Sequence, residues 1–471
     1  MKNKSWISFF LVICFILNLL LTYLLIDARA LYNLYQQFTN IDQQTKLIDE
    51  NHPSETNYYR TVEPTMDQVL APCQIIVNQE GQLYWLPQHI LEELLKDVFN
   101  QPFMEITQKQ ARIDTIELNE HLSKNHIQFI FPNKMPLAFF AKWVKIPIDI
   151  NHQFAINRIV LSRDKDHKVY LVDSINKAYL EGKYDPQKMS DEFLGRVDKT
   201  LDQAVMVDEY AINRDSVYLP KQHLTSPSQV YTLEKIPENL FINPVFKGEN
   251  FDITESQEEH TRLYHNYNKN LMIDDNTNIL IMSQNENYNN QMTQKDLYDI
   301  NLETKIKESL KVLKNFEYWR QGLRVFSENQ HQIVYRRYLG GLPIFPQGDH
   351  VDYGAVKISL TNHVKRINLN QLQLPILTLG VNVDDQSRPI DIETGAEIQA
   401  LLDKAGLKFS QFNQIVLGFE WQANMENFKK VELVPKWFFI VGNRVYSIDQ
   451  IKNGFVREDL AKKPSEIDSV N

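Results

Sequence analysis

Glycine and cysteine are both scarce in this chain of 471 residues. The 15 glycines fall well below the average share of roughly 7%, so little material is available for the glycine-rich loops that hold phosphate groups. There are two cysteines, Cys14 and Cys73, and Cys14 lies inside a long apolar run. We therefore expect no disulfide bridge, and the fold must be held together by ordinary hydrophobic cores.

An excess of positive charge is also missing. The formal net charge is −10 at pH 7, which disfavours a nucleic-acid partner. The composition is nevertheless that of a folded protein, with 43% hydrophobic residues, and the length suggests two to four domains.

No motif of a known catalytic or metal site is present. The sequence has no phosphate loop, no dinucleotide fingerprint and no Gly-x-Ser-x-Gly elbow. The nearest histidines, His260 and His265, lack the spacing that places two imidazoles on one helix face. Cys73 has no histidine near it in the sequence, which favours a buried structural thiol over a nucleophile.

Two pairs of adjacent carboxylates, Asp274-Asp275 and Asp384-Asp385, are better explained as turn residues than as an acid and base couple. Neighbouring side chains in a strand or turn point in different directions. We therefore predict no catalytic, cofactor-binding or metal-binding residues and no enzymatic activity. An enzyme whose active-site residues are dispersed along the sequence stays open as an alternative.

The longest apolar run is Trp6–Ile26, 21 residues without a charge. A helix of this length is about 30 Å long, which matches the hydrocarbon core of a bilayer. Lys2 and Lys4 precede it and predict a cytoplasmic N-terminus. A cleaved signal peptide is the alternative, because Ala28-Arg29-Ala30 resembles a cleavage site, but signal-peptide cores are shorter. We expect an uncleaved single-pass anchor with the bulk of the chain outside the cell.

The predicted anchor carries a stripe of small and polar residues. Cys14, Asn18 and Thr22 follow one another at i, i+4 and i+8, and so share one face of the helix. An asparagine in lipid gains by hydrogen bonding to another helix, so we predict a partner-binding face there. The alternative is that a single asparagine is simply tolerated in a long apolar span.

Local patterns predict mixed α and β structure after the anchor. The segment from Leu31 to Ile41 has helical spacing and reads as a stalk, and the polar stretch Ser283–Asp296 reads as an exposed loop. Hairpins are expected at Cys73–Leu86 and Phe154–Asp173, and helices at Ile90–Phe99 and Pro186–Leu201. Two further strands are expected within Ala204–Leu219, and an antiparallel ribbon at Tyr264–Met282.

One arrangement appears twice toward the C-terminus, namely a helix followed by three strands. The first copy is expected at Leu302–Phe316, Gly322–Ser327, Gln332–Leu339 and Val351–Leu360. The second is expected at Thr394–Ala405, Gln414–Gln422, Val431–Val441 and Arg444–Ile448. Such repetition predicts two related units of a helix on an antiparallel sheet within one C-terminal domain. Gly340-Gly341-Leu342-Pro343 should form the turn after the second strand of the first copy.

Several segments together resemble the YycH family of regulatory proteins from low-GC Gram-positive bacteria. They are the N-terminal anchor, Val217-Tyr218-Leu219-Pro220, Tyr231-Thr232-Leu233-Glu234-Lys235-Ile236-Pro237, Leu240-Phe241-Ile242, Val245-Phe246, and the run Tyr335-Arg336-Arg337-Tyr338-Leu339-Gly340-Gly341-Leu342-Pro343-Ile344-Phe345. The Gly-Leu-Pro-Ile-Phe segment is also similar to the companion family YycI.

The resemblance implies a single-pass membrane protein that acts with YycI on the sensor histidine kinase WalK, also called YycG, and so on cell-wall metabolism. It also implies a three-domain extracytoplasmic portion, and it carries over no catalytic residue. Family members restrain the kinase in some lineages and assist it in others, so the resemblance leaves the sign open. An envelope or division scaffold is a third functional class that stays open.

The expected fold class is α+β, with one transmembrane helix followed by antiparallel sheets packed with helices. We predict the anchor at 1–30, an N-terminal domain with a helical stalk at 31–217, a central domain at 218–298, a YycI-like C-terminal domain at 299–457 and a flexible tail at 458–471.

Overall fold

The computed structural model describes ten stretches of the chain: residues 61–87, 104–107, 111–112, 125–147, 154–185, 191–284, 300–329, 332–363, 366–423 and 429–454. The chain divides into the units Met1–Arg60 and Thr61–Asn471, and all described residues belong to the second. The predicted anchor, the stripe of Cys14, Asn18 and Thr22, the stalk and the C-terminal tail lie outside the described residues. Within these stretches, no helix is long and apolar enough to cross a membrane.

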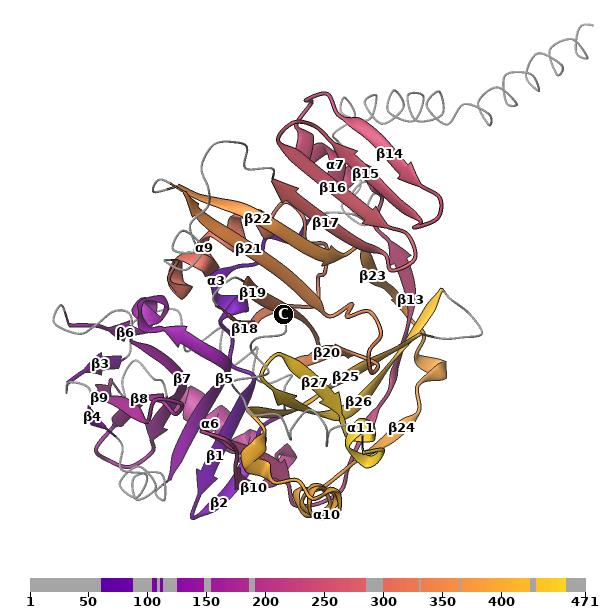
Figure 1. Cartoon of the computed structure of the whole chain (residues 1–471). Coiled ribbons are helices and arrows are strands. Elements are labelled where there is room, and N and C mark those ends of the chain that lie inside the picture. The colour runs from indigo at the N-terminus through magenta and orange to yellow at the C-terminus, as the bar shows by residue number, and fades with distance from the viewer. Residues whose placement is uncertain are drawn as a thin grey trace, which may run out of the picture. The chain divides into compact units, whose positions relative to one another are not determined.

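The fold is α+β and rich in strands, as expected, with a few short helices (Figure 1). Among the described residues, eleven strands form one sheet in the order β11-β10-β2-β1-β5-β7-β8-β9-β3-β6, with β4 paired to β9. Their bounds are β1 Gln74–Gln79, β2 Gln82–Trp85, β3 Met104–Ile106, β4 Ala111–Arg112, β5 His126–Pro136, β6 Val144–Lys145, β7 Ala155–Ser162, β8 Lys168–Asp173, β9 Ala178–Tyr184, β10 Val205–Ala211 and β11 Ser216–Pro220. The helices of this region are α3 Met66–Val69, η3 Leu137–Lys142, α6 Asp191–Thr200 and η4 Leu201–Gln203.

A second sheet of fourteen described strands has the order β14-β15-β16-β17-β22-β21-β19-β20-β25-β26-β13-β23, with β18 paired to β19 and β27 to β26. Its strands are β13 Gln229–Lys235, β14 Asp252–Ser256, β15 Thr261–His265, β16 Lys269–Asp274, β17 Ile279–Gln284, β18 Leu323–Glu328, β19 Gln332–Leu339, β20 Leu342–Pro346, β21 Ala355–His363, β22 Arg366–Pro375, β23 Leu377–Asn382, β25 Gln414–Ala423, β26 Lys430–Val441 and β27 Arg444–Ser447. A separate pair joins β12 Leu224–Pro227 to β24 Pro389–Ile392. The helices are α7 Asn239–Phe246, α9 Leu302–Leu313, η5 Asp384–Gln386, α10 Gly395–Ala405, η6 Phe409–Gln411 and α11 Ile448–Lys452.

The first predicted hairpin is present as β1 and β2, and its local sequence explains it. The register pairs Gln79 with Gln82, which leaves Glu80 and Gly81 as a two-residue turn. Both turn residues have positive φ, +54° and +86°, the backbone that suits the twist of a tight hairpin. The Asn78 side-chain oxygen accepts a hydrogen bond from the Gly81 amide at 3.0 Å, which closes the turn.

The repeated helix-and-strand arrangement is also found, as α9 with β18, β19 and β21, and as α10 with β25, β26 and β27. The turn falls at Gly340 and Gly341, which have φ of +52° and +81°. The β19–β20 ladder stops at the pair Tyr338 and Pro343, as the missing proline N–H predicts. The sequence did not predict that the following residues continue as β20 and pair in parallel with β25, joining the two copies.

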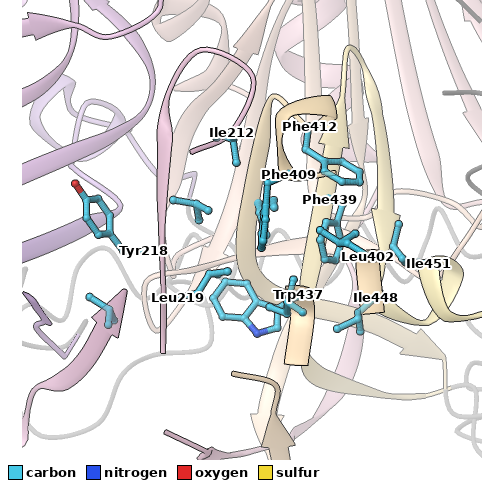
Figure 2. Close-up of a cluster of buried hydrophobic side chains, with 14 of the residues drawn as sticks. Ile212, Tyr218, Leu219, Leu402, Phe409, Phe412, Trp437, Phe439, Ile448 and Ile451 are labelled. Carbon is cyan, nitrogen blue, oxygen red and sulfur yellow. The ribbon is translucent and has the colours of Figure 1, made fainter. Parts of the chain in front are cut away.

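One hydrophobic cluster connects the two sheets (Figure 2). Tyr218 and Leu219 of β11 belong to the same cluster as Trp437 and Phe439 of β26, and all four side chains are buried. Leu402 of α10 and other residues of α10 and α11 complete it. Because the core is shared, the facing parts of the two sheets are held in fixed positions, and the cavity described next lies between them.

Candidate functional site

A cavity of about 390 Å³ lies between the first sheet and the C-terminal repeats. One wall comes from β1, β5, β7 and the β10–β11 turn, and the other from β18 to β20 and β25. Its volume is in the range of pockets that hold small molecules. The lining residues combine amide and charged side chains with apolar ones: Gln74, Asn133, Lys134, Asn157, Asn213, Arg214, Asp215, Asn413 and Gln414 on the polar side, and Trp85, Ile130, Phe131, Ile212, Val217, Phe326, Leu342, Ile415, Val416 and Leu417 on the apolar side.

A bulge in β5 shapes the wall of the cavity. The ladder between β5 and β7 is regular up to Ile130 and resumes at Met135, so the residues between them leave the register. Bulges of this kind redirect side chains next to sites, and here Asn133 and Lys134 line the cavity. The Gln414 amide donates to the Pro132 carbonyl at 2.9 Å and so fastens the bulge to β25 across the cavity.

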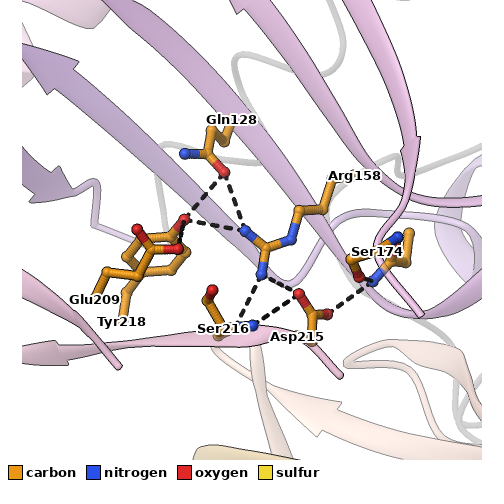
Figure 3. A network of polar contacts seen from close by, with 8 residues as sticks. Gln128, Arg158, Ser174, Glu209, Asp215, Ser216 and Tyr218 are labelled. Carbon is orange, nitrogen blue, oxygen red and sulfur yellow. Dashed lines mark hydrogen bonds and ion pairs between the residues drawn. The ribbon is translucent and has the colours of Figure 1, made fainter. Parts of the chain in front are cut away.

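Arg158 of β7 is the centre of a buried polar network behind this wall (Figure 3). Its Nη1 donates to the Tyr218 hydroxyl at 3.0 Å, and its Nη2 donates to the Asp215 carboxylate and to the Ser216 carbonyl. The Tyr218 hydroxyl in turn donates to the Gln128 side-chain oxygen at 3.2 Å. The network ties the β10–β11 turn to the centre of the first sheet.

The charges of this network neutralise one another. Asp215 accepts from Arg158, from the Asn157 amide at 2.8 Å and from the Ser216 backbone at 2.8 Å, so its carboxylate is fully engaged. Burial is the largest single effect and would lower the pKa of Arg158, but Asp215, Tyr218 and Glu209 together outweigh it and raise that pKa above its ordinary value. Burial also raises the pKa of Tyr218 to about 12, so its hydroxyl stays protonated.

Two further groups at the cavity titrate far from neutral pH. Cys73 forms no disulfide, and its half-buried thiol donates to the Ile130 carbonyl at 3.3 Å. Burial raises its pKa to about 11, although Arg324 nearby lowers it somewhat. Burial likewise raises the pKa of Tyr338, whose ring lies 4.4 Å below the Arg324 guanidinium. The arrangement therefore suits binding better than proton transfer at neutral pH.

The charged side chains that face the cavity differ in whether they are paired within the fold. Lys134 is paired with the buried Asp173 carboxylate at 2.9 Å, and Asp215 is paired with Arg158. Arg214, in the β10–β11 turn, is exposed and makes no hydrogen bond or ion pair with any other residue in the described part of the chain. The cavity thus presents one uncompensated positive charge, although the chain as a whole is acidic.

The sequence predicted none of these residues as a site. The predicted partner-binding residues Cys14, Asn18 and Thr22 fall outside the described residues. A signal for Arg158 did exist, since it is the one charged residue in the strand Ala155–Ser162, whose other residues are apolar apart from Asn157 and Ser162. Its partners lie 30 positions earlier, at Gln128, and 57 to 60 positions later in the chain, and could not be read from that strand. In the parts of the chain that are described, no group of three histidine, cysteine or acidic side chains is placed to hold a metal ion.

Comparisons with known proteins identify relatives for nearly the whole chain. Residues 4–203 match the family model of the YycH protein N-terminal domain, and residues 214–455 match that of the YycH protein C-terminal domain. The crystal structure of YycH from Bacillus subtilis superposes with a TM-score of 0.63 at 15% sequence identity, covering 83% of this chain and 99% of that one. At this identity the superposition establishes the fold. No curated protein matches the chain.

Proposed function

Because the chain belongs to the YycH family, we propose that it is a membrane-anchored regulator that binds and modulates the sensor histidine kinase WalK (YycG) together with a YycI-like protein. The observation that carries this proposal is the match of both family models, which together span residues 4–203 and 214–455. Control of cell-wall metabolism would follow from the action of the kinase.

The proposed location rests on the sequence before residue 30. The uncharged run Trp6–Ile26 is long enough to span a bilayer, and Lys2 and Lys4 favour a cytoplasmic N-terminus. The folded part of the chain would then face the outside of the cell, where the sensor portion of a kinase is accessible. Contacts could form both between membrane helices and between the outer domains.

The chemistry of the cavity favours regulation over the alternative of a wall-associated enzyme. Acid and base catalysis at neutral pH needs a group whose pKa lies near 7. At this cavity the pKa of Cys73 is raised to about 11, and Lys134 and Asp215 are engaged in ion pairs. These groups are suited to holding a structure in place, which is what a binding protein requires.

Co-purification from membranes tests the proposal. The tagged full chain would be purified in mild detergent, and the proteins that come with it identified by mass spectrometry. We expect a histidine kinase and a YycI-like protein in the eluate, and smaller amounts of both from a chain whose residues 6–26 are replaced by an unrelated apolar helix. Recovery of division or wall-synthesis proteins without a kinase would instead favour an envelope scaffold.

Reconstitution tests the regulatory step. The kinase would be placed in lipid vesicles with and without this protein, and its autophosphorylation rate measured. A change in either direction supports the proposal, since the family includes both kinds of effect. An unchanged rate with the YycI-like protein also present would contradict it.

A further inference from the structure

We propose that the cavity between the two sheets binds a small monocarboxylate with an apolar body, and that Arg214 holds its carboxylate. This goes beyond the regulatory function and does not depend on it, because the argument concerns binding alone. It rests on the size of the cavity, the balance of charge on its walls and one buried donor, the Trp85 indole N–H, that has no partner among the described residues.

The balance of charge selects an anion with a single charge. Three charged groups line the cavity among the described residues. Of these, Lys134 is paired with Asp173, and Asp215 is paired with Arg158. Arg214 lines the same cavity without a partner among the described residues. A planar guanidinium matches a carboxylate through two parallel hydrogen bonds. A phosphate group carries more charge and is usually held by several cations or by a glycine-rich loop, which this cavity does not provide.

The rest of the lining selects an apolar body with a hydrogen-bond acceptor. Ile212, Phe131 and Leu417 are among the apolar side chains that face the cavity. Trp85 also lines it and is 8% exposed, and its buried indole N–H has no hydrogen-bond partner in the described part of the chain. A buried donor left unsatisfied is unfavourable, so an acceptor atom on a ligand would recover that cost. The half-buried Gln74 amide, whose side chain has no partner among the described residues, offers a second polar contact.

Binding of two simple acids tests the proposal. The full chain in lipid nanodiscs would be titrated with 3-phenylpropionate and with octanoate by calorimetry, with empty nanodiscs subtracted. The matched amides, 3-phenylpropionamide and octanamide, differ from the acids in charge but hardly in size. We expect at least one acid to bind and its amide to bind about 10-fold more weakly or worse.

Three variants locate the site. Arg214→Gln should weaken binding of the acid about 10-fold to 100-fold, because a hydrogen bond to a charged group is lost. Arg388→Gln is the control, since Arg388 is exposed, lies outside the cavity and pairs with Glu432. Asn213→Trp would narrow the cavity from an exposed position of the β10–β11 turn and should also abolish binding. Melting temperatures of the three variants without ligand should agree, which separates loss of the site from loss of the fold.

The proposal is overturned if neither acid binds, if the amides bind as tightly as the acids, or if Arg214→Gln binds like Arg388→Gln. Binding that survives Asn213→Trp would place the acid elsewhere on the protein and would equally overturn it.

Discussion

The guanidinium of Arg337 lies 2.8 Å from the carboxylate of Glu317, and both side chains are almost fully buried, with 2% and 0% of their area exposed. Each charge has additional partners. Glu317 accepts from the backbone amides of Tyr318 and Trp319 at 2.9 and 2.8 Å, and Arg337 donates to the carbonyls of Leu377 and Pro375. The pair therefore ties the segment after α9 to β19 and to the β22–β23 connection.

Neutralising this pair should destabilise the fold strongly. In Glu317→Gln the Arg337 charge stays buried without its counter-ion, and breaking a buried pair in this way costs about 3–5 kcal/mol. The free energy of unfolding would be measured by urea titration of the portion from residue 31 onward. Glu432→Gln is the control, because its partner Arg388 is 58% exposed and such a pair contributes at most about 1 kcal/mol. Equal losses of unfolding free energy in the two variants would mean that the buried ion pair contributes no more to stability than the exposed one.

Phe345→Ala should cost about 3–5 kcal/mol of stability. The ring is fully buried, its centroid lies 4.3 Å from that of Phe438 and 5.6 Å from that of Phe326, and the Arg336 guanidinium lies 4.4 Å above it. Thermal melts would be compared with those of Val381→Ala, whose side chain is 66% exposed and should be nearly neutral. Normal melting combined with lost partner binding would instead assign Phe345 to an interface.

The thiol of Cys73 should react slowly below pH 9 in the folded protein. Its pKa is raised from 9.0 to about 11, so little thiolate is present at pH 8. Because the pKa of this thiol is higher in the folded chain than in the unfolded chain, protonated Cys73 favours the folded state. Its contribution to the free energy of unfolding is complete below about pH 9 and is lost as the pH rises toward 11. Alkylation by iodoacetamide would be followed in a Cys14→Ser background, and the pH dependence of unfolding compared with that of Cys73→Ala. Rapid alkylation at pH 8 would contradict the raised pKa of the Cys73 thiol.

Reducing agent should leave the melting temperature unchanged. Cys73 is a free thiol, and the remaining cysteine, Cys14, lies in the predicted membrane span. A clear fall in melting temperature on adding dithiothreitol would reveal a bridge that neither the sequence nor the structure accounts for.

Asn18→Leu combined with Thr22→Val should weaken association with partner helices in the membrane by about 3-fold to 30-fold, the range expected for interhelical hydrogen bonds of about 0.6–2 kcal/mol. A bacterial two-hybrid assay would measure it at equal protein levels. The control is Ile16→Leu with Leu20→Val, which alters the opposite face of the helix that the sequence predicts. Unchanged association in the first variant would remove the partner-face hypothesis.

Local features of the fold could be predicted because their causes lie within a few residues of the sequence. The β1–β2 turn depends on Asn78 and Gly81, which are three positions apart. Helix α10 begins after Thr394, whose side chain accepts from the Glu397 amide, and ends at Gly406 with a φ of +71°. The run Tyr335 to Phe345, which indicated the YycH family, forms β19, a glycine turn and β20, so its residues specify a strand pair and its core.

The candidate site was decided by contacts that no local pattern specifies. Arg158 and Asp215 are 57 positions apart, and the cavity beside them is closed by β25, about 200 positions further along the chain. The parallel pairing of Ile344 with Phe419 also depends on Gly418, since a Cβ atom there would lie 2.7 Å from the Pro343 carbonyl oxygen. The sequence by itself determined the short-range elements, the predicted membrane anchor and the family, because these depend on neighbouring residues and on composition. The tertiary structure decided which charges are neutralised and which one faces the cavity. Burial of apolar surface is not directional, so it does not specify which distant polar groups meet. Only the final register of the two sheets brings those groups together.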